Sequence, residues 1–372
     1  MWQEGLLPRI GATARDLDQC KRFDDLVEAL KSAQGIDGRA PFVIPSALAS
    51  RDPDRRAVDS NNLRDWLLKQ GFDSPALHWF ADYGCRDDYG ARAAGTSAWA
   101  ELLYFACRNG AAADADPHSV LTWPEGNGWL VRQMVTWLTA KGGPRLQGQA
   151  LCTRVETRRT GAEIDIYLAT EQRSLRVHAD HVIWAAPAFT LARAWSNPQA
   201  GFRDIVSAIE TSPWLVANLT LDSAPLDLGP AGLAWDNVLR ESEALGYVVA
   251  THQTIRVKPG PTVLTYYWPL ADEAPREARA RLMTTPWKVW ADRIIDELSK
   301  PHPQLRRQLR RIALWRWPHA MSRPVPVFLS LPARDMLAGL AGPLHFAHAD
   351  LSGLSLFEEA NHAGVRAAHA IR

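Results

Sequence analysis

The sequence has little that would direct it to a membrane, a metal or a nucleic acid. Its four cysteines lie far apart without a C-x-x-C pair, which argues against a zinc ribbon or a disulfide framework and favours a reducing compartment. The most apolar run, residues 182–191, is too short to span a bilayer. Because 42 Lys and Arg stand against 41 Asp and Glu, the net charge of +1 predicts no broad field that attracts nucleic acid. We expect a cytoplasmic protein with a small-molecule substrate, unless an export signal precedes this sequence.

Several sequence motifs of known chemistry are also absent. The sequence contains no G-x-G-x-x-G, no Walker loop and no G-x-S-x-G, so neither a standard dinucleotide or phosphate loop nor a common serine hydrolase is supported. Histidines occur in pairs without a third ligand at matching spacing, and we therefore predict no metal site. These pairs are His345 with His348, and His362 with His369.

The composition fits a large folded protein with two or three domains. Of the 372 residues, 47% are hydrophobic, and the sequence has 16 Trp against 7 Tyr and 10 Phe. So many tryptophans suit a deep aromatic cavity as well as an ordinary core. In the first 145 residues the apolar positions recur with the period of a helix. These stripes predict helices near residues 23–30, 63–67, 74–80, 97–108 and 130–138.

Beyond residue 146 the pattern changes to that of strands. Residues 164–168 and 175–179 alternate as a hairpin, and the continuous apolar run 182–187 predicts a strand that is covered on both faces. Together with the helices, these strands predict an α/β (α+β) fold. Further expected elements are strands at residues 214–221, 247–252, 262–268 and 312–317, a helix over 286–298 capped by Thr285, a strand at 344–347, a turn at 350–355 and a C-terminal helix.

The C-terminal stretch resembles the closing segment of the flavin amine oxidase superfamily, which includes relatives of monoamine oxidase, protoporphyrinogen oxidase and phytoene desaturase. It has a strand, an acidic turn with Asp350 and a helix start at Glu358-Glu359-Ala360. Three more segments are similar to the family in the same order. They are the glycine-bearing loop at 123–128, the strands at 151–155 and 179–187, and the substrate-domain strand at 316–321.

The resemblance implies an FAD-dependent oxidoreductase that takes a hydride from an amine or another hydrophobic donor. It also implies a partial FAD-binding Rossmann-like domain beside a substrate domain with a mixed sheet and helices. The expected boundaries are 1–145 for the mainly helical part of the substrate domain, 146–190 for an FAD-binding segment, 191–340 for the substrate-domain sheet with a helical insert, and 341–372 for the C-terminal FAD-binding segment.

Site residues follow from matching the family's segments to this sequence. The resemblance places Trp317 as a wall of the substrate site. The implied cofactor contacts are Cys152 or Val155 to adenine, Ala185 and Ala186 along the nucleotide, Asp350 near the ribityl chain, and the Leu356 and Phe357 amides at the pyrimidine edge. From the residues alone, we add Tyr89 in a predicted loop at 86–90, and His252 as either a base or a structural histidine.

The sequence also departs from the family. Without the opening G-x-G-x-x-G unit, its first residues already match the helical middle of the pattern, which implies a truncation by on the order of 100 or more residues. No lysine is identified as the one that many amine oxidases place beside the flavin, which weakens an amine-specific reading. The alternative is a non-catalytic remnant, or a subunit that needs a second chain to complete the FAD site.

Overall fold

The computed structural model describes residues 12–107, 124–140, 146–225, 233–254, 260–340 and 342–371. The first part of the chain is helical, as its apolar stripes predict. Local chemistry sets the helix starts: the Ser74 hydroxyl accepts a hydrogen bond from Leu77 N, and Asn62 and Ser97 cap their helices in the same way. The helices are α1 (Ala14–Lys31), α2 (Pro53–Arg56), α3 (Leu63–Lys69), α4 (Pro75–Tyr89), α5 (Ala98–Ala106) and α6 (Gly128–Ala140).

The prediction of a loop at residues 86–90 is wrong, because α4 continues through Tyr89 and ends at Gly90. Arg86 is buried inside the helix, where its Nε lies 3.4 Å from Asp82 Oδ2 one turn earlier. Its Nη1 donates to the Glu243 carbonyl at 3.3 Å. These contacts keep the Asp-Asp-Tyr segment helical although its composition is typical of a turn.

The described residues form three sheets, of which the largest has the strand order β6-β7-β8-β5-β9 and is antiparallel throughout. We call it the large sheet. One of its faces packs against helices, and there Trp268 meets Trp290 edge to face with ring centroids 5.4 Å apart. Its elements are β5 (Thr211–Leu221), β6 (Asp236–Val238), β7 (Gly246–Val249), β8 (Thr262–Pro269), β9 (Leu309–Ser322), and the helices α9 (Pro275–Thr284), α10 (Trp287–Leu298) and α11 (Leu305–Gln308).

Four of the five strands of the large sheet overlap the predicted strands, whereas β6 was not predicted and β7 ends three residues earlier than expected. The helices beside the sheet also differ in detail. The sequence did not predict α9, and Thr285 is the residue that ends α9 rather than the cap of the next helix. Pro286 takes the cap position of α10. Proline cannot continue a preceding helix but suits the start of the next, so this one position separates two helices.

The rest of the chain contains a three-stranded antiparallel sheet and a two-stranded parallel sheet. We call the second the parallel pair. The predicted hairpin is confirmed in the first. In the parallel pair, the apolar run at 182–187 is less covered than predicted, because Ile183 at the centre of β4 is 38% exposed. The elements are β1 (Ala150–Thr157), β2 (Ala162–Leu168), β3 (Arg173–Ala179), β4 (Val182–Trp184), α7 (Ala188–Ala194), α8 (Phe202–Val206), α12 (Pro332–Ala338), β10 (Leu344–Phe346) and α13 (Phe357–Ala370).

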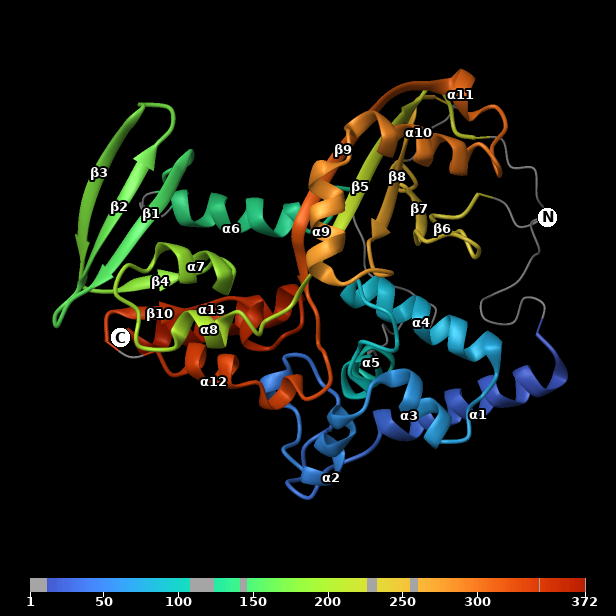
Figure 1. The fold of residues 1–372 in the computed structure, drawn as a ribbon, viewed down its shortest axis with the longest axis horizontal. Coiled ribbons are helices and arrows are strands. Elements are labelled where there is room, and N and C mark those ends of the chain that lie inside the picture. Colours follow the sequence, from blue (N-terminus) through green and yellow to red (C-terminus); the bar gives the residue numbers. More distant parts are fainter. Residues whose placement is uncertain are drawn as a thin grey trace.

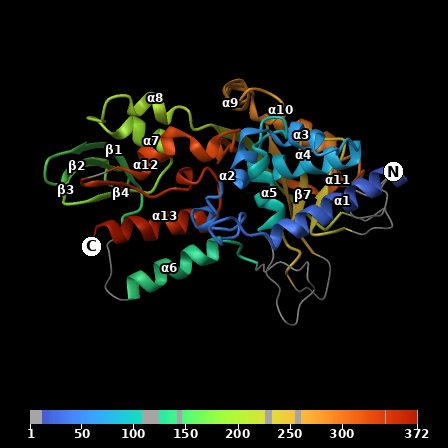
Figure 2. The same ribbon diagram turned by 90° about the horizontal axis from the view of Figure 1, so that it is seen from below.

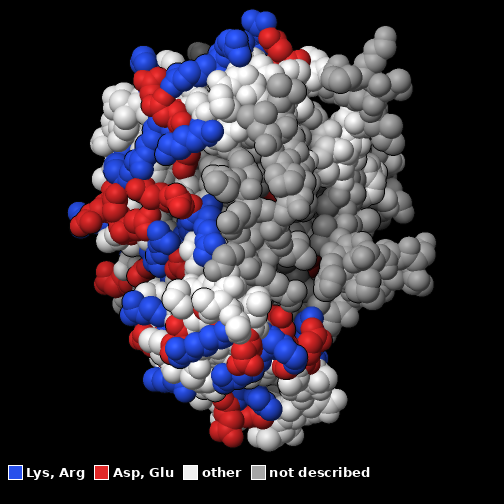
Figure 3. All heavy atoms as spheres, turned by 90° about the vertical axis from the view of Figure 1, so that its right-hand side faces the viewer, with Lys and Arg blue, Asp and Glu red and all other residues white. Residues whose placement is uncertain are grey.

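Figure 1 shows the large sheet with α9 and α10 above the helices α1–α5, while the two smaller sheets lie together with α7, α8, α12 and α13 on the other side of the molecule. In the turned view, α7 and α8 lie on one side of β4, and α13 and α6 lie on the other (Figure 2). None of the helices in the described ranges has the length and hydropathy that a membrane crossing needs. On the face in Figure 3, basic and acidic side chains are interspersed among the described residues.

Candidate functional site

The parallel pair brings together two segments that lie about half the sequence apart. Leu344 pairs with Val182, and Ala347 N donates to the Trp184 carbonyl at 2.9 Å. Because the strands are parallel, their carboxyl ends meet at one edge, where β4 continues into Ala185 and Ala186. We call this the carboxyl edge. Ligands of open parallel sheets bind outside such an edge, and its small alanine side chains leave the backbone accessible.

Asp350 lies at the carboxyl edge but is held by the protein itself. Its side chain is 3% exposed, and its two carboxylate oxygens accept hydrogen bonds from Ala188 N at 2.8 Å and from the Ser322 hydroxyl at 2.7 Å. Burial alone would raise the pKa of this carboxyl, but the hydrogen bonds and His348 outweigh burial and lower it. The geometry therefore favours Asp350 as a junction between segments rather than as a direct contact to a ribityl chain.

The predicted adenine-side residues lie on β1. Val155 is fully buried, and its carbonyl accepts hydrogen bonds from Ser196 N at 2.9 Å and from the Ser196 hydroxyl at 3.2 Å. Cys152 is half-buried where the β1 register is irregular, and burial raises the pKa of its thiol. Neither side chain faces the charged side of the sheet, which carries the ion pairs described next.

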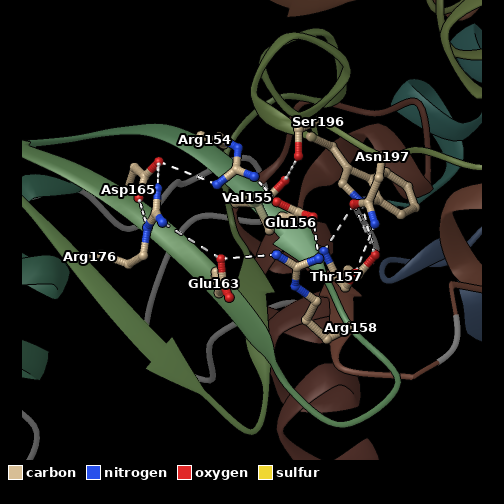
Figure 4. A network of polar contacts seen from close by, with 11 residues as sticks. Arg154, Val155, Glu156, Thr157, Arg158, Glu163, Asp165, Arg176, Ser196 and Asn197 are labelled. Atoms are coloured by element: carbon tan, nitrogen blue, oxygen red, sulfur yellow. Dashed lines mark hydrogen bonds and ion pairs between the residues drawn. The ribbon is translucent and has the colours of Figure 1, made fainter.

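A closed ring of ion pairs covers that charged side (Figure 4). Around the ring, each arginine contacts two acids and each acid contacts two arginines, so the charges balance. Exposed ion pairs of this kind contribute little to stability and leave no net charge for an anionic ligand. The members are Arg154, Glu156, Arg158, Glu163, Asp165 and Arg176.

The predicted pyrimidine-edge residues lie at the start of α13. Leu356 is the cap position, and its N–H donates to the Leu354 carbonyl at 2.9 Å, so it is engaged within the turn. Phe357 is the first helical residue. Helix geometry gives the first-turn N–H groups no intrahelical acceptor, and the helix dipole favours negative charge there. The Phe357 amide therefore fits the predicted role better than the Leu356 amide.

Trp317 lies on the face of the large sheet that α9 and α10 leave uncovered. We call this the open face. Trp317 pairs with Trp214, and Trp315 pairs with Val216, whose other neighbour is Tyr267. Trp317 and Trp315 are 51% and 41% exposed. The same strand, β9, ends in the serine that binds Asp350, so it connects the open face to the carboxyl edge.

The structure does not bring the three proposed catalytic residues together. Tyr89 is buried inside the helical region, where its hydroxyl donates to the Ala100 carbonyl at 2.7 Å. His252 follows β7, with its ring against Trp235 at 5.3 Å between centroids. The register of the antiparallel strands places the end of β7 level with a position on β9 that lies about five residues, or roughly 16 Å, before Trp317. Across the sheet, β8 and β5 lie between β7 and β9. His252 and Trp317 thus lie at opposite ends of the large sheet.

A polar and aromatic cluster that the sequence did not single out bridges α4 and the open face. The Tyr267 hydroxyl donates to Asp236 Oδ1 at 2.6 Å, and Tyr83 stacks on Trp79 at 5.6 Å between centroids. Desolvation, with Asp87 and Asp236 nearby, raises the pKa of both phenols, and desolvation also raises the pKa of Asp236. Spacing along α4 relates Trp79 to Tyr83, but only the folded chain places Tyr267 beside them.

The fold has clear counterparts among solved structures. Putrescine oxidase bound to putrescine aligns with 100% of this chain and 78% of its own, with a TM-score of 0.67 and 15% identity. Cyclohexylamine oxidase from Brevibacterium oxydans IH-35A aligns with 98% and 76%, with a TM-score of 0.63 and 16% identity. A fatty acid isomerase from P. acnes that produces CLA aligns with 98% and 77%, with a TM-score of 0.62 and 12% identity.

Two of these neighbours are amine oxidases, and the likeness confirms the fold that the sequence resemblance implied. No protein-family model and no curated protein matches the sequence. At these identities the likeness shows the fold alone. The activity therefore has to be argued from the residues of the carboxyl edge and the open face.

Proposed function

We propose that this protein is an FAD-dependent oxidoreductase that takes a hydride from an amine or another hydrophobic donor. The observation that carries the proposal is the carboxyl edge, where β4 and β10 end side by side in alanines and α13 begins nearby. Fold neighbours that include a putrescine oxidase and a cyclohexylamine oxidase support the same reading. When bound, FAD would supply the hydride acceptor.

The residues of this chain fit one side of the cofactor. Ala185 and Ala186 would line the nucleotide, because small side chains let a ligand approach the backbone. The Phe357 amide would donate to an electron-rich ring edge. Asp350 would act on the cofactor indirectly, since its two oxygens already hold Ala188 and Ser322. In this proposal, these residues bind and orient the cofactor. The open face with Trp317 would exclude water from an apolar substrate.

The diphosphate side of the cofactor has no glycine-rich loop in this sequence. We propose that a further segment or a second chain supplies it. Exposed apolar side chains near the parallel pair, Ile183 on β4 and Val365 on α13, are suitable contacts for such a unit. The alternative is that this chain is a remnant or a binding subunit without flavin chemistry of its own. A gene region that encodes no G-x-G-x-x-G motif, either upstream in the same reading frame or in a neighbouring gene, would favour that alternative.

The test is an FAD titration of the purified chain, alone and together with the unit that carries the glycine-rich loop, followed by absorbance and flavin fluorescence. We expect weak binding to the chain alone and stoichiometric retention after gel filtration in the completed protein. Ala185→Trp should weaken FAD binding because the indole fills the carboxyl edge, whereas Ala29→Trp, at an exposed position on α1, should not. A completed protein that binds no FAD, or that binds it equally in both variants, contradicts the proposal.

A further inference from the structure

We propose that His181 and His345 form a binding site for a divalent transition-metal ion. His181 directly precedes β4, and His345 is the central residue of β10. The parallel pairing places Nδ1 of His181 3.2 Å from Nε2 of His345, with ring centroids 5.3 Å apart and ring planes inclined by 45°. Neither histidine pair considered from sequence spacing contains this combination, because 164 positions separate the two residues.

The distance between the two ring nitrogens suits coordination of one shared ion. Imidazole nitrogens bind zinc at about 2.0–2.1 Å, so two of them at tetrahedral or octahedral angles lie about 2.9–3.4 Å apart. The 3.2 Å separation falls within that range. In the metal-free chain, the same distance permits a hydrogen bond from one ring to the other.

A metal ligand must be the neutral imidazole, so an ion and a proton compete for the same ring nitrogens of the two histidines. The Arg366 guanidinium lies near His345 and is held by the Phe346 and Ala338 carbonyls at 3.1 Å each. The carboxylate nearest in sequence is that of Asp180, which is exposed.

Two histidines define the class of ion. The described residues contain no cluster of three or more His, Cys, Asp or Glu side chains that could hold a metal, so water would fill the remaining positions. Imidazole ligands select Zn²⁺, Ni²⁺ and Cu²⁺, whereas Mg²⁺ and Ca²⁺ prefer oxygen ligands. An ion held by both residues would link the start of β4 to the middle of β10 and stabilise the parallel pair by mass action.

The experiment uses the full chain without a histidine tag, freed of metal and titrated with ZnCl₂, NiCl₂ or MgCl₂. Calorimetry should show one zinc or nickel ion per chain, with a rise in Tm, and magnesium should give neither. Binding should weaken as the pH falls below the ordinary histidine pKa of about 6.5, because protons compete for the nitrogens. CoCl₂ should give the visible absorption bands of a ligand-bound ion.

Variants assign the binding to this site. His181→Ala and His345→Ala should each abolish the zinc-dependent rise in Tm, while His369→Ala, at an exposed position near the end of α13, should retain it. Circular dichroism of each metal-free variant checks that the fold is intact. Zinc binding that survives in both site variants, or a wild-type chain whose Tm does not respond to zinc, overturns the proposal.

Discussion

The Ser322 hydroxyl donates a hydrogen bond to the Asp350 carboxylate at 2.7 Å, and this contact joins the end of β9 to the turn after β10. The other carboxylate oxygen holds Ala188 N at the start of α7. One buried acid therefore ties the large sheet, the parallel pair and α7 together. The contact sets where the open face meets the carboxyl edge, which is the arrangement that the proposed function needs.

We expect Asp350→Ala to lower the free energy of unfolding by about 3 kcal/mol, because it leaves two buried donors unpaired. Urea unfolding measures the change. Since the folded pKa of Asp350 lies below its unfolded value, its contribution is present above about pH 4 and is lost as the pH falls through the folded pKa. The Asp350→Ala variant should not show this loss of stability in acid. Asp25→Ala, at an exposed position on α1, should change stability little, and an equal cost for both would remove Asp350 from this role.

Gly90 permits α4 to end directly against the large sheet. Its φ of 58° is left-handed, and an added Cβ would lie 2.5 Å from Trp214 Nε1 and 2.8 Å from Ser212 Cβ. We expect Gly90→Ala to cost about 3 kcal/mol, from the left-handed backbone and from overpacking together. Gly71→Ala is the matched control, because Gly71 follows α3 with a φ of 78° and nothing within 4 Å, so about 1 kcal/mol is expected there. Equal losses of stability in the two variants would show that the large sheet moves to accommodate the added methyl group.

Glu101 is a fully buried acid between α4 and α5. Its carboxyl group lies against Gly84 and beside the Cys85 thiol. Burial first, and then Asp88, Asp87 and Asp82, raise the pKa of Glu101 well above its ordinary value. The carboxyl is therefore protonated in the folded protein at pH values where it is ionised in the unfolded chain.

Glu101→Gln should make the protein less sensitive to alkaline pH. The contribution of a protonated Glu101 is complete below its unfolded pKa of about 4.3 and is lost as the pH rises toward the folded pKa. Between these two pKa values, the free energy of unfolding of the variant should rise relative to that of the wild type by about 1.4 kcal/mol for each pH unit. Denaturant unfolding from pH 5 upward measures the difference, with Glu28→Gln on the exposed side of α1 as control. A constant difference across this range would show that Glu101 is already ionised.

Local chemistry made much of the fold predictable. Ser74 and Pro75 identify the start of α4 because the cap and the first turn are formed by neighbours in sequence. The end of the same helix was mispredicted, since the contact from Arg86 to the Glu243 carbonyl exists only in the folded protein.

The candidate site was less predictable for the same reason. The family's pattern suggested that β4 and β10 lie together, and the parallel pair agrees with it. By contrast, whether His252 and Trp317 share a site depends on the strand order of the large sheet, and β8 and β5 separate them. Asp350 has the expected place, but its partners Ala188 and Ser322 cannot be read from spacing.

The two faces of the large sheet should respond differently to the loss of a tryptophan. Trp268 is 1% exposed against Trp290, with Arg293 4.4 Å from its ring centroid, so Trp268→Ala should cost about 4 kcal/mol of unfolding free energy. Trp317 is 51% exposed on the open face, and Trp317→Ala should cost less than about 1 kcal/mol. Chemical denaturation of both variants gives the comparison. Similar costs would mean that the open face is packed in solution, which would leave no room there for an apolar substrate.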